Sequence, residues 1–201
     1  SLPDRDYYLK TEGRNLQIQE AYKKYITTLF TITGTKESDA KQNAETIFAL
    51  EKQLANAQMS RVEMRDPYKT YNKLHIDEFS KTTEGLNWRL ILTDLQVKGE
   101  DSILVNNPGF FKEVARLLKS TPLQDWQTYL QWNVLKSSAP YLSSAFVDAN
   151  FAFNQVQSGQ RIQTPRWLRI SSLTDGSIGE LLGQLYVKEY FKPEAKARMA
   201  E

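Results

Sequence analysis

Apolar residues recur along most of the chain at alternating spacings of three and four, the pattern that places side chains on one face of an α-helix. The first row consists of Ile18, Tyr22, Tyr25, Leu29 and Ile32. Gly34 follows as the predicted helix end, because glycine adopts the left-handed conformation at little cost. A second helix is predicted over residues 38–57. Asp66-Pro67 then interrupts the pattern, because the residue before a proline is pushed out of the helical region.

The middle of the chain combines short helices with one predicted strand. Helices are expected over residues 76–81 and 88–95, and residues 103–105 have the composition of a short strand. Asn107 as the cap and Pro108 at the first helical position predict another helix. The sequence Thr121-Pro122-Leu123-Gln124 is typical of the next helix start, with the threonine as its cap.

Two predictions concern the helix that begins after Thr121. Its apolar row, which we expect to face the core, consists of Leu123, Trp126, Leu130 and Val134. Trp132 lies off this row, which makes it the best candidate for a second contact surface. Pro140 is expected to end or kink the helix, because proline lacks a backbone N–H.

The last third of the chain is also predicted to be helical. One row, closed by Gly159, consists of Leu142, Phe146, Ala149, Phe153 and Val156. Another helix is expected to start at Thr164-Pro165 and to place Trp167 in the core, with an interruption at Gly176. An apolar run follows over residues 178–187. Residues 193–201 start a helix that no glycine, asparagine or proline stops, so we expect it to be truncated from a longer protein.

Composition agrees with a globular protein. Of the 201 residues, 40% are hydrophobic and 25% charged, which with the helical periodicity predicts one all-α domain over residues 1–201. We expect roughly eight to ten helices and at most a small β-hairpin. Lys and Arg total 26 against 24 Asp and Glu, a net charge of +2 that is too balanced to predict binding to nucleic acid or an acidic membrane.

The residues available for chemistry are few. Cysteine is absent, which excludes thiol nucleophiles, thiolate metal sites and disulfides, and His75 is the only histidine. With Asp77 or Glu78 nearby, His75 could act as a general base, but a lone imidazole without partners is better interpreted as a surface or helix-capping residue. The pair Asp4 and Asp6 is likewise interpreted as solvated carboxylates.

The glycines at 176, 179 and 183 lack the spacing of a phosphate-binding loop, and we interpret them as small residues that permit close helix packing. Nothing in these residues supports hydrolysis, redox chemistry or group transfer by the chain alone. No catalytic or metal-binding residue is therefore assigned, and the substrate-binding residues stay unknown.

Four segments carry a resemblance to a known family. They are residues 2–8 (Leu-Pro-Asp-Arg-Asp-Tyr-Tyr), residues 50–55 (Leu-Glu-Lys-Gln-Leu-Ala), Arg65-Asp66-Pro67 with Tyr71-Asn72-Lys73, and residues 182–187 (Leu-Gly-Gln-Leu-Tyr-Val) with Phe191 and Lys196. In this order and spacing they resemble the N-terminal helical lobe of the neprilysin and endothelin-converting-enzyme family of zinc metalloendopeptidases. Vertebrate members carry cysteines where Leu9 and Ile170 stand here, so the resemblance favours a bacterial-type relative.

The resemblance implies that the chemistry lies elsewhere in a longer protein. In the family, a C-terminal catalytic domain binds zinc through His-Glu-x-x-His and a downstream glutamate, and the first glutamate activates the zinc-bound water. None of these residues occurs here, since His75 is followed by Ile76-Asp77-Glu78-Phe79. The resemblance therefore implies a lobe that contacts its own catalytic domain, walls the active-site chamber and limits substrates to short peptides.

Two alternatives remain open from the residues alone. One is a stand-alone helical interaction module that never had a catalytic half, and the other is an independent hydrolase that uses His75. A targeting signal would lie upstream of these residues, so an exported (periplasmic or cell-surface) and a cytoplasmic location in a bacterium are both open.

Overall fold

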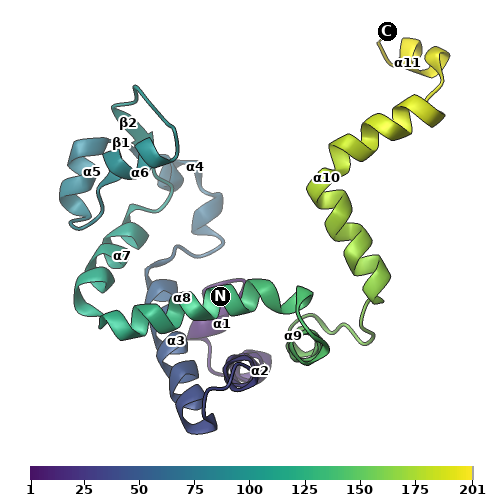
Figure 1. The fold of residues 1–201 in the computed structure, drawn as a ribbon. Helices are drawn as coiled ribbons and strands as arrows, with labels where there is room; N and C mark the ends of the chain where they lie inside the picture. Colours follow the sequence, from purple (N-terminus) through teal and green to yellow (C-terminus); the bar gives the residue numbers. More distant parts are fainter. Residues whose placement is uncertain (201) are drawn as a thin grey trace. The chain divides into compact units, whose positions relative to one another are not determined.

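The computed structural model describes residues 1–200, and within them lie eleven α-helices, two 3-10 helices and one two-stranded sheet (Figure 1). The all-α prediction with a small hairpin is confirmed. Two of the helices, α1 (Asp6–Leu9) and α4 (Pro67–Thr70), are single turns of four residues. The chain divides into two compact units, Ser1–Gly159 and Gln160–Glu201, and each is described by itself below.

The core of the first unit is built on two long helices, α2 (Gly13–Ile32) and α3 (Glu37–Ala57), which pack against each other. The predicted row on α2 is confirmed, because four of its five members are buried and Ile32 packs against the same cluster. Gly34 has a φ of 94° and follows the helix end, as its conformational freedom predicts. The large side chains of this row therefore pack in the core of the first unit.

A smaller region follows in the chain. It contains η1 (Glu63–Arg65), α4, β1 (Lys73–His75), α5 (Ile76–Thr82), α6 (Trp88–Asp94), β2 (Ser102–Leu104) and α7 (Pro108–Ser120). The strands pair antiparallel with Leu74 opposite Ile103. Phe79 of α5 and Trp88 of α6 stack with ring centroids 4.9 Å apart. The cap of α7 is as predicted, since Asn107 Oδ1 accepts the N–H of Phe110 and Pro108 begins the helix.

Helix α8 (Leu123–Ser138) lies across α2 and α3, and η2 (Ala139–Tyr141) and α9 (Ser144–Ser158) follow it (Figure 1). The prediction that Thr121 caps α8 is wrong. Helix α7 continues to Ser120, so Thr121 becomes its C-cap, and Pro122 precedes α8 without a side-chain cap. Pro140 lies in η2 just after α8 ends, as expected. Gly159 ends α9 with a φ of 78°.

The predicted core face of α8 is also wrong. Leu123, Leu130 and Val134 are 73%, 61% and 64% exposed, whereas Trp132, predicted to serve a second surface, is fully buried. The physical reason is a competing row at equally helical spacing, which consists of Thr128, Trp132, Leu135 and Ala139. This row includes the large indole, which packs edge-on against the rings of Tyr22 and Tyr25. Each row contains one tryptophan, and Trp126 of the predicted row is half-buried, so the partners that α2 offers to Trp132 decide which face is buried.

The second unit consists of α10 (Arg166–Tyr190) and α11 (Pro193–Ala200). Helix α10 is kinked at Ile178, where the backbone angles are non-helical, two residues after Gly176, where we predicted an interruption. Trp167 is 69% exposed rather than in a core, and no residue of α10 is buried. Among the described helices, none has the length and apolar character needed to cross a membrane.

Candidate functional site

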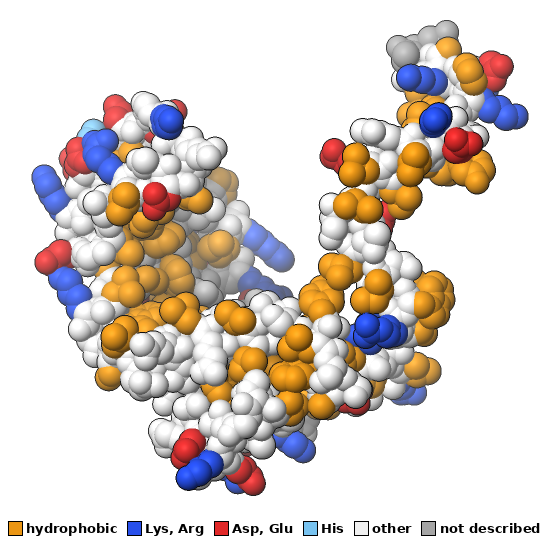
Figure 2. All heavy atoms as spheres, viewed as in Figure 1, with side chains coloured by type: hydrophobic (Ala, Val, Ile, Leu, Met, Phe, Trp, Pro, Cys, Tyr) orange, Lys and Arg blue, Asp and Glu red, His pale blue; other side chains and the backbone are white. Residues whose placement is uncertain are grey.

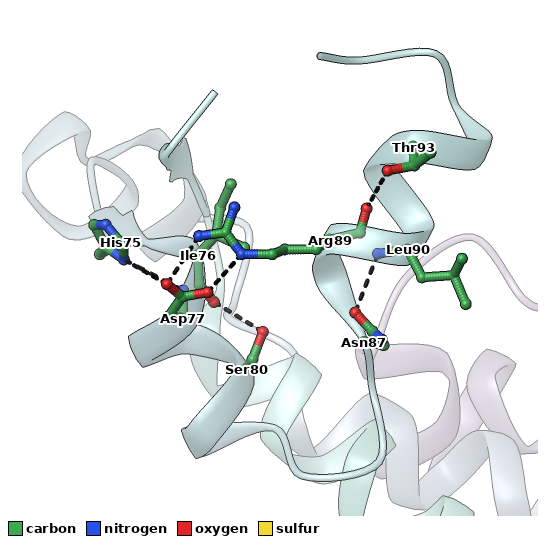
Figure 3. A network of polar contacts seen from close by, with 8 residues as sticks. All are labelled: His75, Ile76, Asp77, Ser80, Asn87, Arg89, Leu90 and Thr93. Carbon is green, nitrogen blue, oxygen red and sulfur yellow. Dashed lines mark hydrogen bonds and ion pairs between the residues drawn. The ribbon is translucent and has the colours of Figure 1, made fainter. Parts of the chain in front are cut away.

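The lone histidine lies at the start of a helix. His75 ends β1 and caps α5, and its Nδ1 accepts the backbone N–H of Asp77 at 3.3 Å (Figure 3). The Asp77 carboxylate is bound by Arg89 of α6 through two hydrogen bonds, Nε to Oδ1 at 2.7 Å and Nη2 to Oδ2 at 2.8 Å. Hydrogen bonding by Arg89 lowers the pKa of Asp77. This carboxylate therefore pairs with a guanidinium on an exposed surface, and the interpretation of His75 as a capping residue is confirmed.

The N-terminal carboxylates do not form an acid–base pair. Asp4 is bound by Arg61, and Asp6 pairs with Lys10 at 2.8 Å within α1. Asp4 also accepts the backbone N–H of Asp6, which orders the turn before α1. Each carboxylate thus has its own cationic partner, and both are explained as structural groups.

The most buried polar cluster is centred on Glu51 of α3, a residue that the sequence analysis missed. Glu51 is only 3% exposed, and its Oε2 accepts the hydroxyls of Tyr8 and Tyr22, each at 2.9 Å. The Tyr22 hydroxyl in turn accepts the indole N–H of Trp132 at 3.1 Å. Burial raises the pKa of both tyrosines well above the usual range. The cluster therefore links α1, α2, α3 and α8 through protonated hydroxyls.

A signal for this cluster was present in the sequence. Glu51 lies in the apolar row of α3, four residues before Ala55 and four after Ile47, where a solvated carboxylate is not expected. A buried carboxylate needs hydrogen-bond donors, and tyrosine hydroxyls on a facing helix can supply them. The groups of this cluster bond to one another within the core, so we interpret the arrangement as structural.

The outward side of α8 is the best candidate for a functional surface in the first unit. We call this surface the α8 outer face, and it consists of Leu123, Gln124, Gln127, Leu130, Gln131, Val134 and Ser137, all exposed. It contains an apolar row and a row of amides, and no charged residue. Along the visible part of α8, Figure 2 shows orange and white atoms. Exposed leucines and valine in one row are typical of an interaction surface.

Metal ligands do not cluster in the part of the chain that the structure describes. Among these residues, no group of three or more His, Asp or Glu side chains could hold a metal ion. The catalytic zinc of the family that the sequence resembles would therefore have to be bound outside residues 1–200. The polar clusters around His75, Asp4 and Glu51 cap a helix, pair ions or join the core.

Comparison with solved structures shows that this chain shares its fold with part of proteins described as zinc metalloproteases. The zinc metalloprotease Zmp1 of Mycobacterium tuberculosis in its open state is 28% identical, with a TM-score of 0.86 over 100% of this chain and 31% of the Zmp1 chain. PepO from Lactobacillus rhamnosis is 17% identical with a TM-score of 0.77 over 99% of this chain, which shows a shared fold.

The chain belongs to peptidase family M13, whose N-terminal family model matches residues 1–201. Human endothelin-converting enzyme 1 is 27% identical over 207 residues, which covers 100% of this chain and 27% of that enzyme. The rat enzyme is 28% identical over 97% of this chain and 26% of its own length. The resemblance to the neprilysin and endothelin-converting-enzyme family is thus confirmed. The chain spans about a quarter of the length of these relatives.

Proposed function

We propose that this chain is the non-catalytic lobe of a longer zinc metalloendopeptidase, and that it walls the active-site chamber and limits substrates to short peptides. The match of residues 1–201 to the N-terminal model of family M13 carries the proposal. The relatives are named for zinc metalloprotease and endothelin-converting activity, and this chain corresponds to only 26–31% of their length. Zinc and the catalytic base then belong to the remaining polypeptide, and this lobe contributes exclusion and peptide contacts.

We assign the peptide-contacting role to the α8 outer face. The amides of Gln124, Gln127 and Gln131 each offer two N–H donors and an oxygen acceptor, which match the main chain of a bound peptide. The neighbouring row of Leu130 and Val134 suits apolar side chains. Because the face has no charge, it would accept short peptides with little regard to their net charge.

The first experiment uses the full-length protein with a short fluorogenic peptide and the same cleavage site placed within a folded protein. We expect cleavage of the short peptide only, loss of activity with a chelator and recovery with zinc. The 201-residue chain alone should be inactive. Turnover by that chain, zinc-independent activity or equal cleavage of the folded substrate would each refute the proposal. A coding sequence that stops after Glu201, without a downstream His-Glu-x-x-His, would favour the stand-alone module.

The second experiment places a charge on the α8 outer face of the full-length protein. In Gln127→Lys, we expect a lower KM for acidic peptides and a higher KM for basic ones, with thermal stability unchanged because the side chain is solvated. The matched control is Gln17→Lys, an exposed glutamine on α2, which should leave both KM values unchanged. Equal effects of the two variants, or none, would exclude this face from substrate contact.

A further inference from the structure

Residues 60–120, which we call the small lobe, have a core of their own within the first unit. The rings of Phe79, Trp88 and Phe111 pack against one another, with centroids 4.9, 5.9 and 5.1 Å apart. None of the described buried residues of the small lobe belongs to the core cluster of α2 and α3. A region with a separate core can move as one body when its links to the rest of the protein are weak.

The small lobe is attached to the rest of the first unit over a narrow area. Among its described elements, only α7 has extensive contact outside the lobe, and that contact is with α3. Figure 1 shows α5, α6 and the two strands gathered beyond α7, away from α2. The chain enters the lobe beside the start of α7, because Asn107 Nδ2 donates to the Ala57 carbonyl at 3.4 Å. Two adjacent connections of this kind are typical of a pivot.

The N-terminal turn links the main core to the small lobe at a second point. Tyr8 is buried and fixes the turn in the main core. Arg61, at the start of the lobe, binds the Asp4 carboxylate, and Arg5 Nη1 donates to the Gln58 carbonyl at 2.6 Å. The Arg61 side chain is 68% exposed, so water and salt can compete for this ion pair.

A cavity of about 330 Å³ lies where the turn, the connection and the lobe meet. Arg5 lines it from the turn, Met59 from the connection, Met64 from the lobe and Phe110 from the start of α7. Packed interiors leave few voids larger than a water molecule, and methionine side chains adapt readily to a changed spacing. The small lobe can therefore separate from the turn without disrupting a packed core.

We propose that the small lobe pivots on α3, and that the Asp4–Arg61 ion pair is a latch that holds the lobe against the N-terminal turn. When the ion pair breaks, the lobe keeps its own core and its contact through α7, and the cavity beside Met59 and Met64 opens. Salt screens exposed charges, so release increases with ionic strength. The proposal does not depend on the proposed function, because no part of it involves zinc or a peptide.

The test measures the distance between two spin labels in the full-length protein. Residues 1–201 contain no cysteine, so labels are attached through Gln17→Cys on α2 and Asp94→Cys on α6, both exposed positions, after any cysteine elsewhere is replaced by serine. We expect two distances, one for the latched and one for the released lobe. Arg61→Gln should raise the released population by up to about fivefold, the range expected for an exposed ion pair.

Arg89→Gln is the matched control, because the partner of this exposed arginine, Asp77, lies within the small lobe. This variant should leave the two populations unchanged. Asp4→Asn keeps an oxygen that accepts the N–H of Asp6, and it should match Arg61→Gln. Added sodium chloride should raise the released population in the protein with the ion pair and not in Arg61→Gln. A single narrow distance in every variant, or equal shifts in Arg61→Gln and Arg89→Gln, would overturn the proposal.

Discussion

Tyr22→Phe tests the Glu51 cluster with the smallest possible change, the loss of one hydroxyl. That hydroxyl donates to Glu51 Oε2 at 2.9 Å and accepts the indole N–H of Trp132 at 3.1 Å. The ring is fully buried, so no water is expected to replace the lost oxygen. The ring's own packing against Trp132 and Phe153, at centroid distances of 5.7 and 5.5 Å, should persist.

The expected cost follows from what the change leaves unpaired. Removing a hydrogen bond to a charged group costs about 1.5–3 kcal/mol, and a buried donor without an acceptor costs about 1–3 kcal/mol. Glu51 keeps its hydrogen bond from Tyr8, which limits the cost of the hydrogen bond that Glu51 loses. We therefore expect Tyr22→Phe to lower the free energy of unfolding by about 3 kcal/mol.

Tyr25→Phe is the matched control. Tyr25 lies on the same helix, is also buried and packs against the same two rings, but its hydroxyl donates to the neutral Asn150 Oδ1 at 3.0 Å. Its loss should cost about 1 kcal/mol. Urea unfolding of both variants, with m unchanged, gives the comparison. If Tyr22→Phe costs no more than Tyr25→Phe, the buried cluster does not stabilise the fold as we argue.

Two further predictions concern titratable groups. Burial raises the pKa of Tyr8 and Tyr22 in the folded state. Their contribution to the free energy of unfolding is therefore complete below the unfolded pKa of about 10. It falls as the pH rises further, because only the unfolded chain then loses these protons. Urea midpoints measured at increasing alkaline pH should decrease, and the decrease should be smaller in Tyr8→Phe; a midpoint independent of pH in this range would contradict the assignment. His75→Ala removes a long helix-capping hydrogen bond, so we expect a loss of about 0.5–1 kcal/mol in unfolding free energy and unchanged peptidase activity of the full-length protein. Abolished activity would instead support a catalytic His75.

Several elements could be predicted because their causes are local. The row on α2, the stop at Gly34, the cap at Asn107-Pro108 and the capping role of His75 each depend on residues within about four positions. The family was also recognisable from short segments in order. These features need only helix periodicity and backbone preferences, which the sequence specifies directly.

Residues within about four positions did not predict which of two possible helix faces is buried. On α8, both the Leu130–Val134 row and the Thr128–Trp132 row have helical spacing, and our choice of the first was wrong. Trp132 is buried because Tyr22, 110 residues earlier in the chain, supplies a hydroxyl acceptor and an aromatic surface. Glu51 is buried for the same kind of reason, since its donors come from other helices.

The sequence by itself therefore determined the longer helices, several of their ends, the family and the lack of a cysteine or histidine cluster. The tertiary structure alone decided which faces of the first unit enter its core, which carboxylate is buried and which apolar row of α8 faces outward. The physical reason is that helix formation depends on neighbours within a turn or two, whereas burial depends on which distant side chains offer matching area and hydrogen-bond partners.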